Sequence, residues 1–226
     1  MLRIILIGPP GVGKGTQGAL LESRWSARQL SSGNIFRAEI DAQTDLGNLA
    51  KRYIDQGRLV PNGVTIEMMA KRMRQSEIQQ NGFILDGFPR TVDQAKALDM
   101  LLMEMNQPLD GAVSIEVDDE IVVGRLSGRI GCTKCGAIYH SETKPPKREF
   151  ICDNCNSPLF VRSDDKPDAI RQRLQIFHDD TRDVINHYAS SGLLKKIDGN
   201  QNPENVYKDV ILALGKELMG TSNEIK

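Results

Sequence analysis

The sequence lacks three features that would point to particular classes of protein. Its 29 basic and 30 acidic residues leave a formal net charge of −1, so bulk charge does not indicate a general polyanion-binding surface. No apolar run is long enough to cross a bilayer, and the apolar start of the chain is too short for a signal peptide. Its 4 cysteines all lie between positions 132 and 155, unlike the spread framework of a secreted protein. We therefore expect a soluble cytoplasmic protein with neither a membrane segment nor a nucleic-acid partner.

The chain alternates short apolar runs with stretches of helical periodicity. This alternation is typical of βαβ units and a mostly parallel sheet, and 226 residues suffice for one main domain with a smaller insertion. We expect strands at 2–7, 29–31, 83–86, 112–117 and 193–197. We expect helices at about 14–25, 62–79, 91–105, 167–190 and 203–218, followed by a frayed tail at 220–226.

Two segments interrupt the alternation. Residues 32–60 have a helical pattern without a long strand between the helices, which predicts a small helical lobe. Residues from about 128 to 165 contain the cysteines together with several glycines and prolines, and they show little helical periodicity. We interpret this second segment as a compact inserted subdomain.

Residues 8–16 read Gly-Pro-Pro-Gly-Val-Gly-Lys-Gly-Thr and directly follow the first apolar strand. A glycine-rich turn between a strand and a helix lets backbone N–H groups surround a phosphate, while the helix N-terminus and Lys14 add positive charge. The segment therefore predicts a P-loop that holds a nucleotide polyphosphate. A tight turn with a solvated lysine would not explain five glycines and prolines before Lys14. Unlike the usual P-loop, Gly15 separates Lys14 from the hydroxyl of Thr16.

Residues 83–90 read Phe-Ile-Leu-Asp-Gly-Phe-Pro-Arg, an apolar strand that ends at Asp86. Ligands bind at the carboxyl ends of parallel strands, and a strand-end aspartate in a P-loop protein commonly holds Mg²⁺, directly or through water. We therefore expect Asp86 to face the P-loop; the alternative is an aspartate that only caps a helix or turn. Arg90 begins the next helix and can bind a phosphate through two N–H groups.

Two Cys-x-x-Cys pairs, Cys132 with Cys135 and Cys152 with Cys155, are separated by sixteen residues. This spacing predicts a closed tetrahedral site in which four thiolates hold one structural zinc ion. Redox dithiols or disulfides are the main alternative, and iron could occupy such a site after heterologous expression. A closed site has no open coordination position, so we do not expect it to be catalytic.

Together, these motifs resemble adenylate kinase, of the bacterial kind whose lid carries a zinc site. The resemblance covers nearly the whole chain. The P-loop of this family also has glycine and threonine after the lysine. It rests on the cysteine pairs and on GPPGVGKGT (8–16), LSSGNIFR (30–37), LDGFPRTVDQ (85–94), GRLSGR (124–129), RSDD (162–165) and RQRL (171–174). The implied fold is an α/β P-loop kinase with a five-stranded parallel sheet flanked by helices. Its implied parts are a core (1–30, 61–127 and 166–226), a helical AMP-binding lobe (31–60) and a zinc-binding lid (128–165).

The resemblance also implies roles for individual positions. The implied catalytic residues are Lys14, Asp86, Arg90, Arg125, Arg129, Arg162 and Arg173. The implied ATP-binding residues are Gly11, Val12, Gly13, Lys14, Gly15, Thr16, Arg129, Ile138, Tyr139 and Gln201. The implied AMP-binding residues are Ser32, Arg37, Arg58, Leu59, Val60, Gly87, Phe88, Pro89, Arg90, Gln94, Arg162 and Arg173. The implied zinc ligands are Cys132, Cys135, Cys152 and Cys155.

The implied reaction is reversible phosphoryl transfer from Mg-ATP to AMP, giving two ADP and maintaining adenine nucleotide balance, by a monomer. In such a reaction the protein aligns two anionic nucleotides and neutralises the moving charge, which explains a need for many arginines. Gln94 is placed to bind adenine by paired hydrogen bonds. A kinase for CMP or UMP is the alternative within the class. A zinc-ribbon nucleic-acid-binding protein with a nucleotide switch and an inactive P-loop regulator are the alternatives outside it.

Three positions depart from the family pattern. Asn34 stands where aspartate is more frequent, Gln201 stands where some members have lysine, and residues 179–183 lack a proline that many members carry. His140 lies near the cysteines but is superfluous to a four-thiolate site. We assign no role to His178 or His187.

Overall fold

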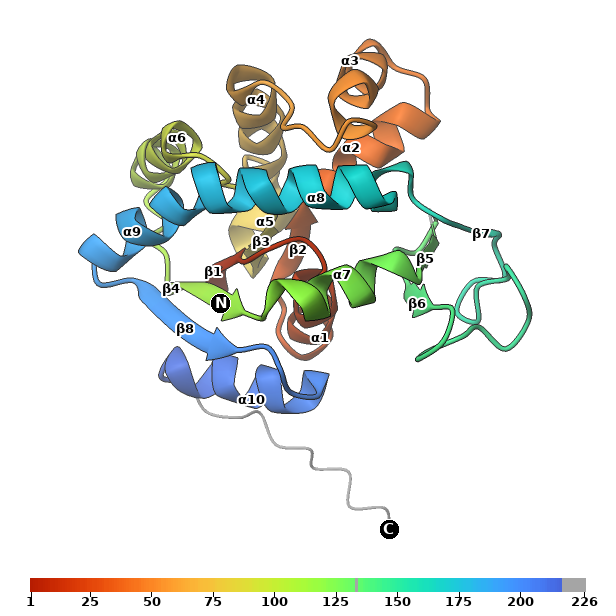
Figure 1. Ribbon diagram of the computed structural model, residues 1–226. Helices are drawn as coiled ribbons and strands as arrows, with labels where there is room; N and C mark the ends of the chain where they lie inside the picture. The colour runs from red at the N-terminus through yellow and green to blue at the C-terminus, as the bar shows by residue number, and fades with distance from the viewer. Residues whose placement is uncertain (133, 217–226) are drawn as a thin grey trace.

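The computed structural model describes residues 1–132 and 134–216. Within these residues the core is a five-stranded parallel sheet with the order β2-β3-β1-β4-β8 (Figure 1). Its strands are β1 (Leu2–Ile7), β2 (Arg28–Ser31), β3 (Gly82–Asp86), β4 (Gly111–Glu116) and β8 (Leu194–Asp198). Because Leu6 pairs with Asp86 in parallel register, the loops that follow β1 and β3 leave the sheet at the same edge.

Helices cover both faces of this sheet, which is why the central strands are nearly continuous apolar runs. Ile5 and Ile7 of β1 belong to one buried cluster, whereas Ile4 and Leu6 belong to another on the opposite face. The helices that contribute to the first cluster are α4 (Asn62–Met73), α5 (Ser76–Asn81), α6 (Val92–Glu104) and α9 (Arg182–Ser190). Those that contribute to the second are α1 (Lys14–Arg24) and α10 (Pro203–Ala213).

Two short helices, α2 (Ser32–Asp41) and α3 (Asp45–Ile54), form a separate projection beside the sheet (Figure 1). Each begins at a hydroxyl cap: Ser31 Oγ accepts from the Asn34 N–H, and Thr44 Oγ1 accepts from the Gly47 N–H. The pair has its own small apolar cluster, which includes Phe36, Ala50 and Val60.

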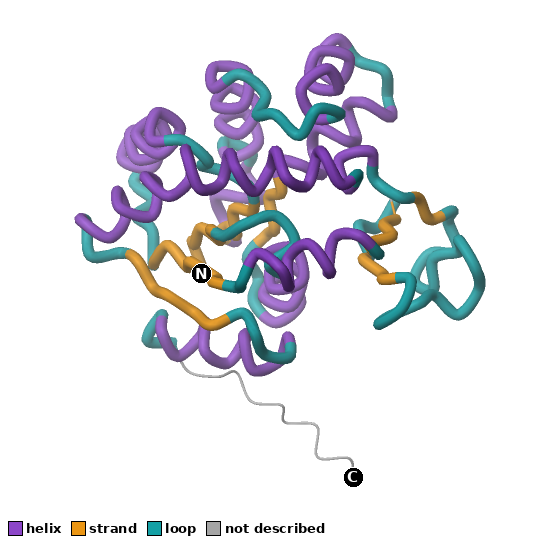
Figure 2. The backbone as a smooth tube through the Cα atoms, in the orientation of Figure 1, coloured by secondary structure: helices purple, strands orange, loops and turns teal. Residues whose placement is uncertain are grey.

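The cysteine-containing segment folds as a second, antiparallel sheet, at the right of the view in Figure 2. Its order is β6-β5-β7, with β5 (Arg129–Cys132), β6 (Ile138–His140) and β7 (Leu159–Phe160). Helix α7 (Asp119–Ser127) leads into this sheet, and the 3-10 turn η1 (Ser163–Asp165) leads from it into α8 (Pro167–Ile176). The two helices pack together through residues that include Leu126 and Ile170.

The structure confirms the five predicted strands and corrects several helices. The helix expected at 62–79 is two helices, α4 and α5, because the chain turns at Arg74 and Gln75. The helix expected at 167–190 contains a π-helical turn, η2 (Phe177–Thr181), between α8 and α9. Helix α7 was not predicted. Helix α10 ends at Ala213, before Gly215 takes a positive φ of 65°, so the predicted helix is too long at 214–216. Positions 217 and 218 of that prediction and the tail at 220–226 lie outside the described residues.

Among the described residues, no helix is both long and apolar enough to cross a membrane.

Candidate functional site

The loop after β1 curls back on itself before α1 begins. Gly11 and Gly13 have positive φ angles of 78° and 110°, which other residues rarely adopt. Lys14 Nζ donates hydrogen bonds to the backbone carbonyls of Gly8 at 2.7 Å and Pro9 at 2.8 Å. The lysine ammonium is therefore held at the mouth of the loop, beside the N-terminus of α1.

The ammonium of Lys14 lies in an unusually positive environment. Burial is the largest influence and lowers its pKa from 10.5 to about 7; Asp86 raises the pKa, whereas Arg90, Arg173 and Arg129 lower it. A group whose positive charge is disfavoured by burial and by like charges is stabilised by an incoming anion. The site thus favours a ligand that carries several negative charges.

Asp86 ends β3 at the sheet edge from which the P-loop also leaves. Its Oδ2 accepts a hydrogen bond of 3.4 Å from Gln29 Nε2 on the neighbouring strand β2. Gly15, at the start of α1, lies against the same carboxylate, since a Cβ built at position 15 would be 3.7 Å from Asp86 Oδ2. The structure therefore brings Asp86 and the P-loop together.

The turn after Asp86 joins the sheet to α2 and α6. Ser32 Oγ and Arg90 Nε both donate to the carbonyl of Gly87, at 2.7 and 2.8 Å. Gly87 has a positive φ of 75°, and a Cβ there would lie 2.8 Å from Arg90 Nη2. The amide of Gln94 is held internally, accepting from the Arg90 N–H at 2.8 Å and donating to Asn62 Oδ1 at 2.9 Å. Glycine at position 87 therefore leaves room for Ser32 and Arg90 to share its carbonyl oxygen.

Five arginines from separate segments lie close enough for their positive charges to repel one another. They lie on α2, on the turn after β3, at the start of β5, just before η1 and on α8: Arg37, Arg90, Arg129, Arg162 and Arg173. Burial, followed by neighbouring arginines, lowers the pKa of Arg90 to about 10 and that of Arg162 to about 9. Such crowding of positive charge indicates a site for a strongly anionic ligand.

Two buried aspartates hold part of this arginine group. Asp165 accepts two hydrogen bonds from Arg129, from Nε at 2.7 Å and from Nη2 at 2.5 Å. Arg173 Nη1 lies 3.0 Å from Asp164 Oδ2 and 3.1 Å from Asp165 Oδ1. Sequence reasoning assigned roles only to the arginines; the adjacent acidic pair in the RSDD motif was the available signal.

The remaining sequence-predicted residues have mixed environments. Arg125 donates to the backbone carbonyls of Val12 at 3.2 Å and Gly199 at 3.1 Å, so it joins the P-loop to the segment after β8. Gln201 donates to the Asp198 carbonyl and to Asp209 Oδ2. Asn34 Oδ1 accepts from Arg37 Nη2 at 2.9 Å, a contact that its amide supplies without a negative charge. Arg58 is exposed, with its guanidinium over the Tyr53 ring.

One cleft of about 1280 Å³ contains nearly all the predicted nucleotide-binding residues. It is lined by the P-loop, α2, the turn after β3, Ile138 and Tyr139 of the second sheet, and the arginine group. Phe88 is the exception among the predicted residues, because its side chain is buried in the core cluster on one face of the sheet. The cleft therefore brings together residues of the P-loop, of α2 and of the second sheet.

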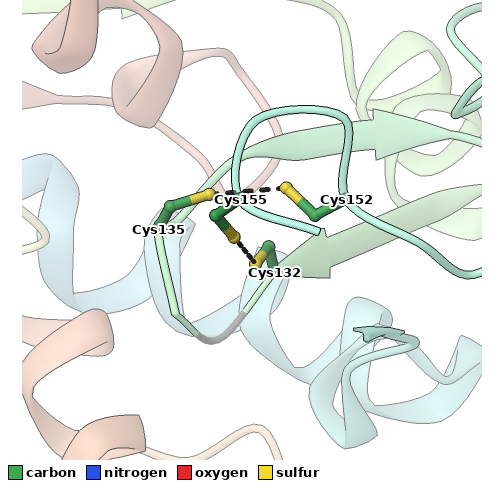
Figure 3. A group of neighbouring side chains, drawn as sticks. All are labelled: Cys132, Cys135, Cys152 and Cys155. Atoms are coloured by element: carbon green, nitrogen blue, oxygen red, sulfur yellow. Dashed lines mark hydrogen bonds between the residues drawn. The ribbon is translucent and has the colours of Figure 1, made fainter. Parts of the chain in front are cut away.

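The four cysteines converge from two loops of the second sheet (Figure 3). Their Sγ atoms all lie within 4.8 Å of one another, and the Cys132–Cys155 and Cys135–Cys152 separations are both 3.5 Å. A disulfide would need about 2.05 Å. Tetrahedral zinc with bonds of about 2.3 Å places its sulfurs about 3.8 Å apart, so the cluster has the dimensions of a four-thiolate site.

Tyr139 supports this cluster from β6. Its hydroxyl lies 3.6 Å from Cys152 Sγ and accepts from the Asp153 N–H at 2.8 Å. This contact was not predicted, since only nucleotide binding was expected of Tyr139. His140 contributes no sulfur contact; its Nδ1 lies 3.1 Å from the Glu142 N–H and organises the following turn.

The other two histidines pair with aspartates on neighbouring helices. His178 Nε2 lies 2.8 Å from Asp119 Oδ2, and His187 Nε2 lies 2.6 Å from Asp99 Oδ2. Both residues therefore connect helices, and neither is among the residues that line the cleft.

The parallel sheet, the P-loop and the arginines at one sheet edge define an α/β P-loop protein.

The family model described as Adenylate kinase matches residues 6–193. Proteins named Adenylate kinase are similar along most of the chain. One from Lachnoclostridium phytofermentans is 45% identical over 215 residues, which cover 95% of this chain and 99% of that protein. One from Desulfitobacterium hafniense is 46% identical over 213 residues, 94% and 98% of the two chains. One from Clostridium acetobutylicum is 44% identical over 215 residues, 95% and 100%. The chain belongs to the adenylate kinase family.

Proposed function

We propose that this protein is an ATP:AMP phosphotransferase, which reversibly transfers a phosphoryl group from Mg-ATP to AMP and thereby balances the adenine nucleotides. The observation that carries the proposal is the single cleft in which Lys14, Asp86 and five arginines meet. Two nucleotides bring many negative charges together, and this cleft concentrates positive charge at the sheet edge where they would meet.

ATP binds at the P-loop in this proposal. The backbone N–H groups of 11–16 surround its phosphates, the N-terminus of α1 adds a favourable dipole, and Lys14 exchanges its carbonyl partners for phosphate oxygens. Arg129, Ile138, Tyr139 and Gln201 complete the ATP side. Because the side chain of Tyr139 is directed to the cysteines, its backbone and ring face are the parts left for the nucleotide.

AMP binds on the other side of the cleft, against the lobe formed by residues 31–60. Arg90 and Arg37 hold its phosphate, and the turn at 87–90 shapes the site around Ser32. The contacts proposed for the base and ribose come from Arg58, Leu59, Val60 and Gln94. Reading adenine requires the Gln94 amide to exchange its contacts with Arg90 and Asn62 for the base.

The protein contributes alignment and charge rather than covalent chemistry. In this proposal Arg162 and Arg173, which line the cleft, neutralise the moving phosphoryl group, while Arg125 holds the P-loop through the Val12 carbonyl. A bound Mg²⁺ ion supplies further charge neutralisation, and Asp86 is the residue placed to hold it. Residues 128–165 form a lid over the core (1–30, 61–127 and 166–226) and exclude water, as is known for adenylate kinase lids.

The four cysteines hold structural zinc in the lid and take no part in the transfer. The donor set supports this assignment because four thiolates leave no open position for substrate. Thiols remain available as ligands in a reducing compartment, which supports a cytoplasmic location. All proposed site residues come from one chain, and we therefore propose a monomer with ATP, AMP and ADP as its partners, without nucleic acid or membrane.

An acceptor panel tests the function. Purified protein is incubated with Mg-ATP and with AMP, CMP, UMP or GMP, and ADP formation is measured together with zinc and iron content. We expect a strong preference for AMP and one zinc ion per chain. A preference for CMP or UMP contradicts the AMP assignment, and ATP binding without transfer to any acceptor contradicts the enzyme assignment.

A further inference from the structure

The side chain of Gln29 lies between the P-loop helix and the carboxylate of Asp86. Its Nε2 is 3.4 Å from Asp86 Oδ2 and 3.4 Å from the carbonyl oxygen of Gly15. Both partners are acceptors, so the amide must present its N–H₂ group to them. A single side chain on β2 therefore connects the strand-end carboxylate to the start of α1.

Strand register explains how Gln29 reaches both groups. In the parallel pair of β2 and β3, Ser31 lies opposite Asp86, and Gln29 lies opposite Ile84. Residues two apart on a strand point to the same face of the sheet, so Gln29 and Asp86 share the face that α1 covers.

Gly18 of α1 leaves the space that the amide occupies. A Cβ built at position 18 would lie 2.3 Å from Gln29 Nε2 and 2.5 Å from its Cδ. Glycine is among the least favourable residues inside a helix, and Gly18 lies within α1 at a backbone conformation that does not itself require glycine. The close approach of Gln29 gives this glycine a physical reason.

We infer that Gln29 is a positioning residue that orients the Asp86 carboxylate toward the P-loop, and that Gly18 is required to admit its amide. The inference rests on the proposed function, because it concerns the residue placed to hold Mg²⁺. The Gln29 amide donates a hydrogen bond to Asp86 Oδ2. This contact fixes the rotation of the carboxylate and leaves Oδ1 for the metal or its water. Ordering the carboxylate beforehand removes part of the entropic cost of binding the metal nucleotide.

Binding of Mn²⁺–ATP tests the inference without relying on turnover. Its Kd is measured by electron paramagnetic resonance for the unaltered protein, Gln29→Ala, Gly18→Ala and Asp86→Ala. We expect Gln29→Ala and Gly18→Ala each to weaken binding about fivefold, the effect of one net hydrogen bond. The Mg²⁺ concentration that gives half-maximal ADP formation should rise in parallel. Unchanged Kd and unchanged Mg²⁺ dependence in folded Gln29→Ala would overturn the inference.

Double variants establish the route of the effect. Adding Gln29→Ala to Asp86→Ala should weaken Mn²⁺–ATP binding no further, and adding Gly18→Ala to Gln29→Ala should also have no further effect. Full additivity in either pair contradicts the inferred contact.

The matched controls are Gln172→Ala, an exposed glutamine on α8, and Gly63→Ala, a helical glycine with nothing within 4 Å of the added Cβ. An unaltered protein that binds Mn²⁺–ATP but does not phosphorylate AMP overturns the proposed function alone, since these binding measurements do not involve the acceptor.

Discussion

Arg129 and Asp165 form a two-point ion pair that joins the start of β5 to the end of η1. The Nε–Oδ2 and Nη2–Oδ1 distances are 2.7 and 2.5 Å, and the side chain of Asp165 is only 1% exposed. The two residues bracket the proposed lid, so this pair connects the two chain segments through which the second sheet is attached. It also holds Arg129 at the cleft, where its charge acts on Lys14.

Removing the charge of Asp165 should destabilise the protein strongly. Asp165→Asn leaves the guanidinium of Arg129 without its buried counter-ion, and we expect the free energy of unfolding to fall by about 3 kcal/mol. Urea unfolding at pH 7 measures the change. Asp168→Asn is the control, because Asp168 is 97% exposed and pairs with Arg171 in solvent; a comparable loss in this control would contradict the role of burial.

Acid should weaken the contribution of Asp164. Burial opposes ionisation of Asp164, but Arg173, Arg37, Arg129 and Arg162 outweigh it and lower the pKa below 3.8. A depressed carboxyl pKa stabilises the folded state above about pH 3.8 and loses this contribution as pH falls through the folded value. Asp164→Asn should therefore be less stable than the unaltered protein at pH 6. Calorimetric melting curves should show this difference shrinking below about pH 4, which is about the ordinary pKa of a carboxyl group. A difference independent of pH would argue for lost packing instead.

Loss of the cysteine site should affect stability more than chemistry. Cys132→Ser combined with Cys135→Ser removes two of the four thiolates and should release the metal, lowering Tm by about 5–10 °C. Turnover at a temperature well below both melting points should remain close to normal. Elemental analysis accompanies the melting curves, and Thr143→Ser, at an exposed position of the same subdomain, is the control. Unchanged melting with unchanged metal content would contradict a structural metal.

Lys14 should be essential for transfer. Lys14→Met keeps much of the side-chain length but removes the ammonium that lies at the P-loop, and we expect kcat/KM to fall at least about 100-fold. Steady-state ADP formation measures the loss, and circular dichroism checks the fold. Lys71→Met, at an exposed position of α4, should retain full activity; normal turnover by Lys14→Met would exclude the mechanism proposed above.

Gly87 offers a test of the AMP side of the cleft. Gly87→Ala forces a side chain onto a backbone with φ of 75° and places its Cβ 2.8 Å from Arg90 Nη2. Gly192 has a similar φ of 74° but nothing within 4 Å of an added Cβ. Both alanine variants should lose about 1 kcal/mol of stability through backbone strain. Only Gly87→Ala should raise KM for AMP. Equal KM values for the two variants would contradict the assignment of Gly87 to the AMP site.

Local patterns predicted most of the fold. The strands β1 and β3 are continuous apolar runs because helices cover both faces of the sheet, and such runs are visible in the sequence. The boundaries of helices were less accurate. The break at Arg74 and Gln75 and the π-helical turn at 177–181 contain no glycine or proline that would mark them in the sequence. Helix α7 was missed because its nine residues present only Val122 and Leu126 as buried positions.

Groups whose chemistry is contained in a short segment could be recognised from the order of residues alone. The P-loop needs only closely spaced glycines, a lysine and a following helix, and each cysteine pair needs only a two-residue spacing. Contacts between side chains that are distant in the sequence became visible in the folded chain: Asp165 with Arg129, Gln29 with Asp86, and the Tyr139 hydroxyl with Cys152. These contacts depend on strand order and on how the second sheet is attached to the core. Burial then decides their strength, because charges and hydrogen bonds that are withdrawn from water interact more strongly than those at the surface.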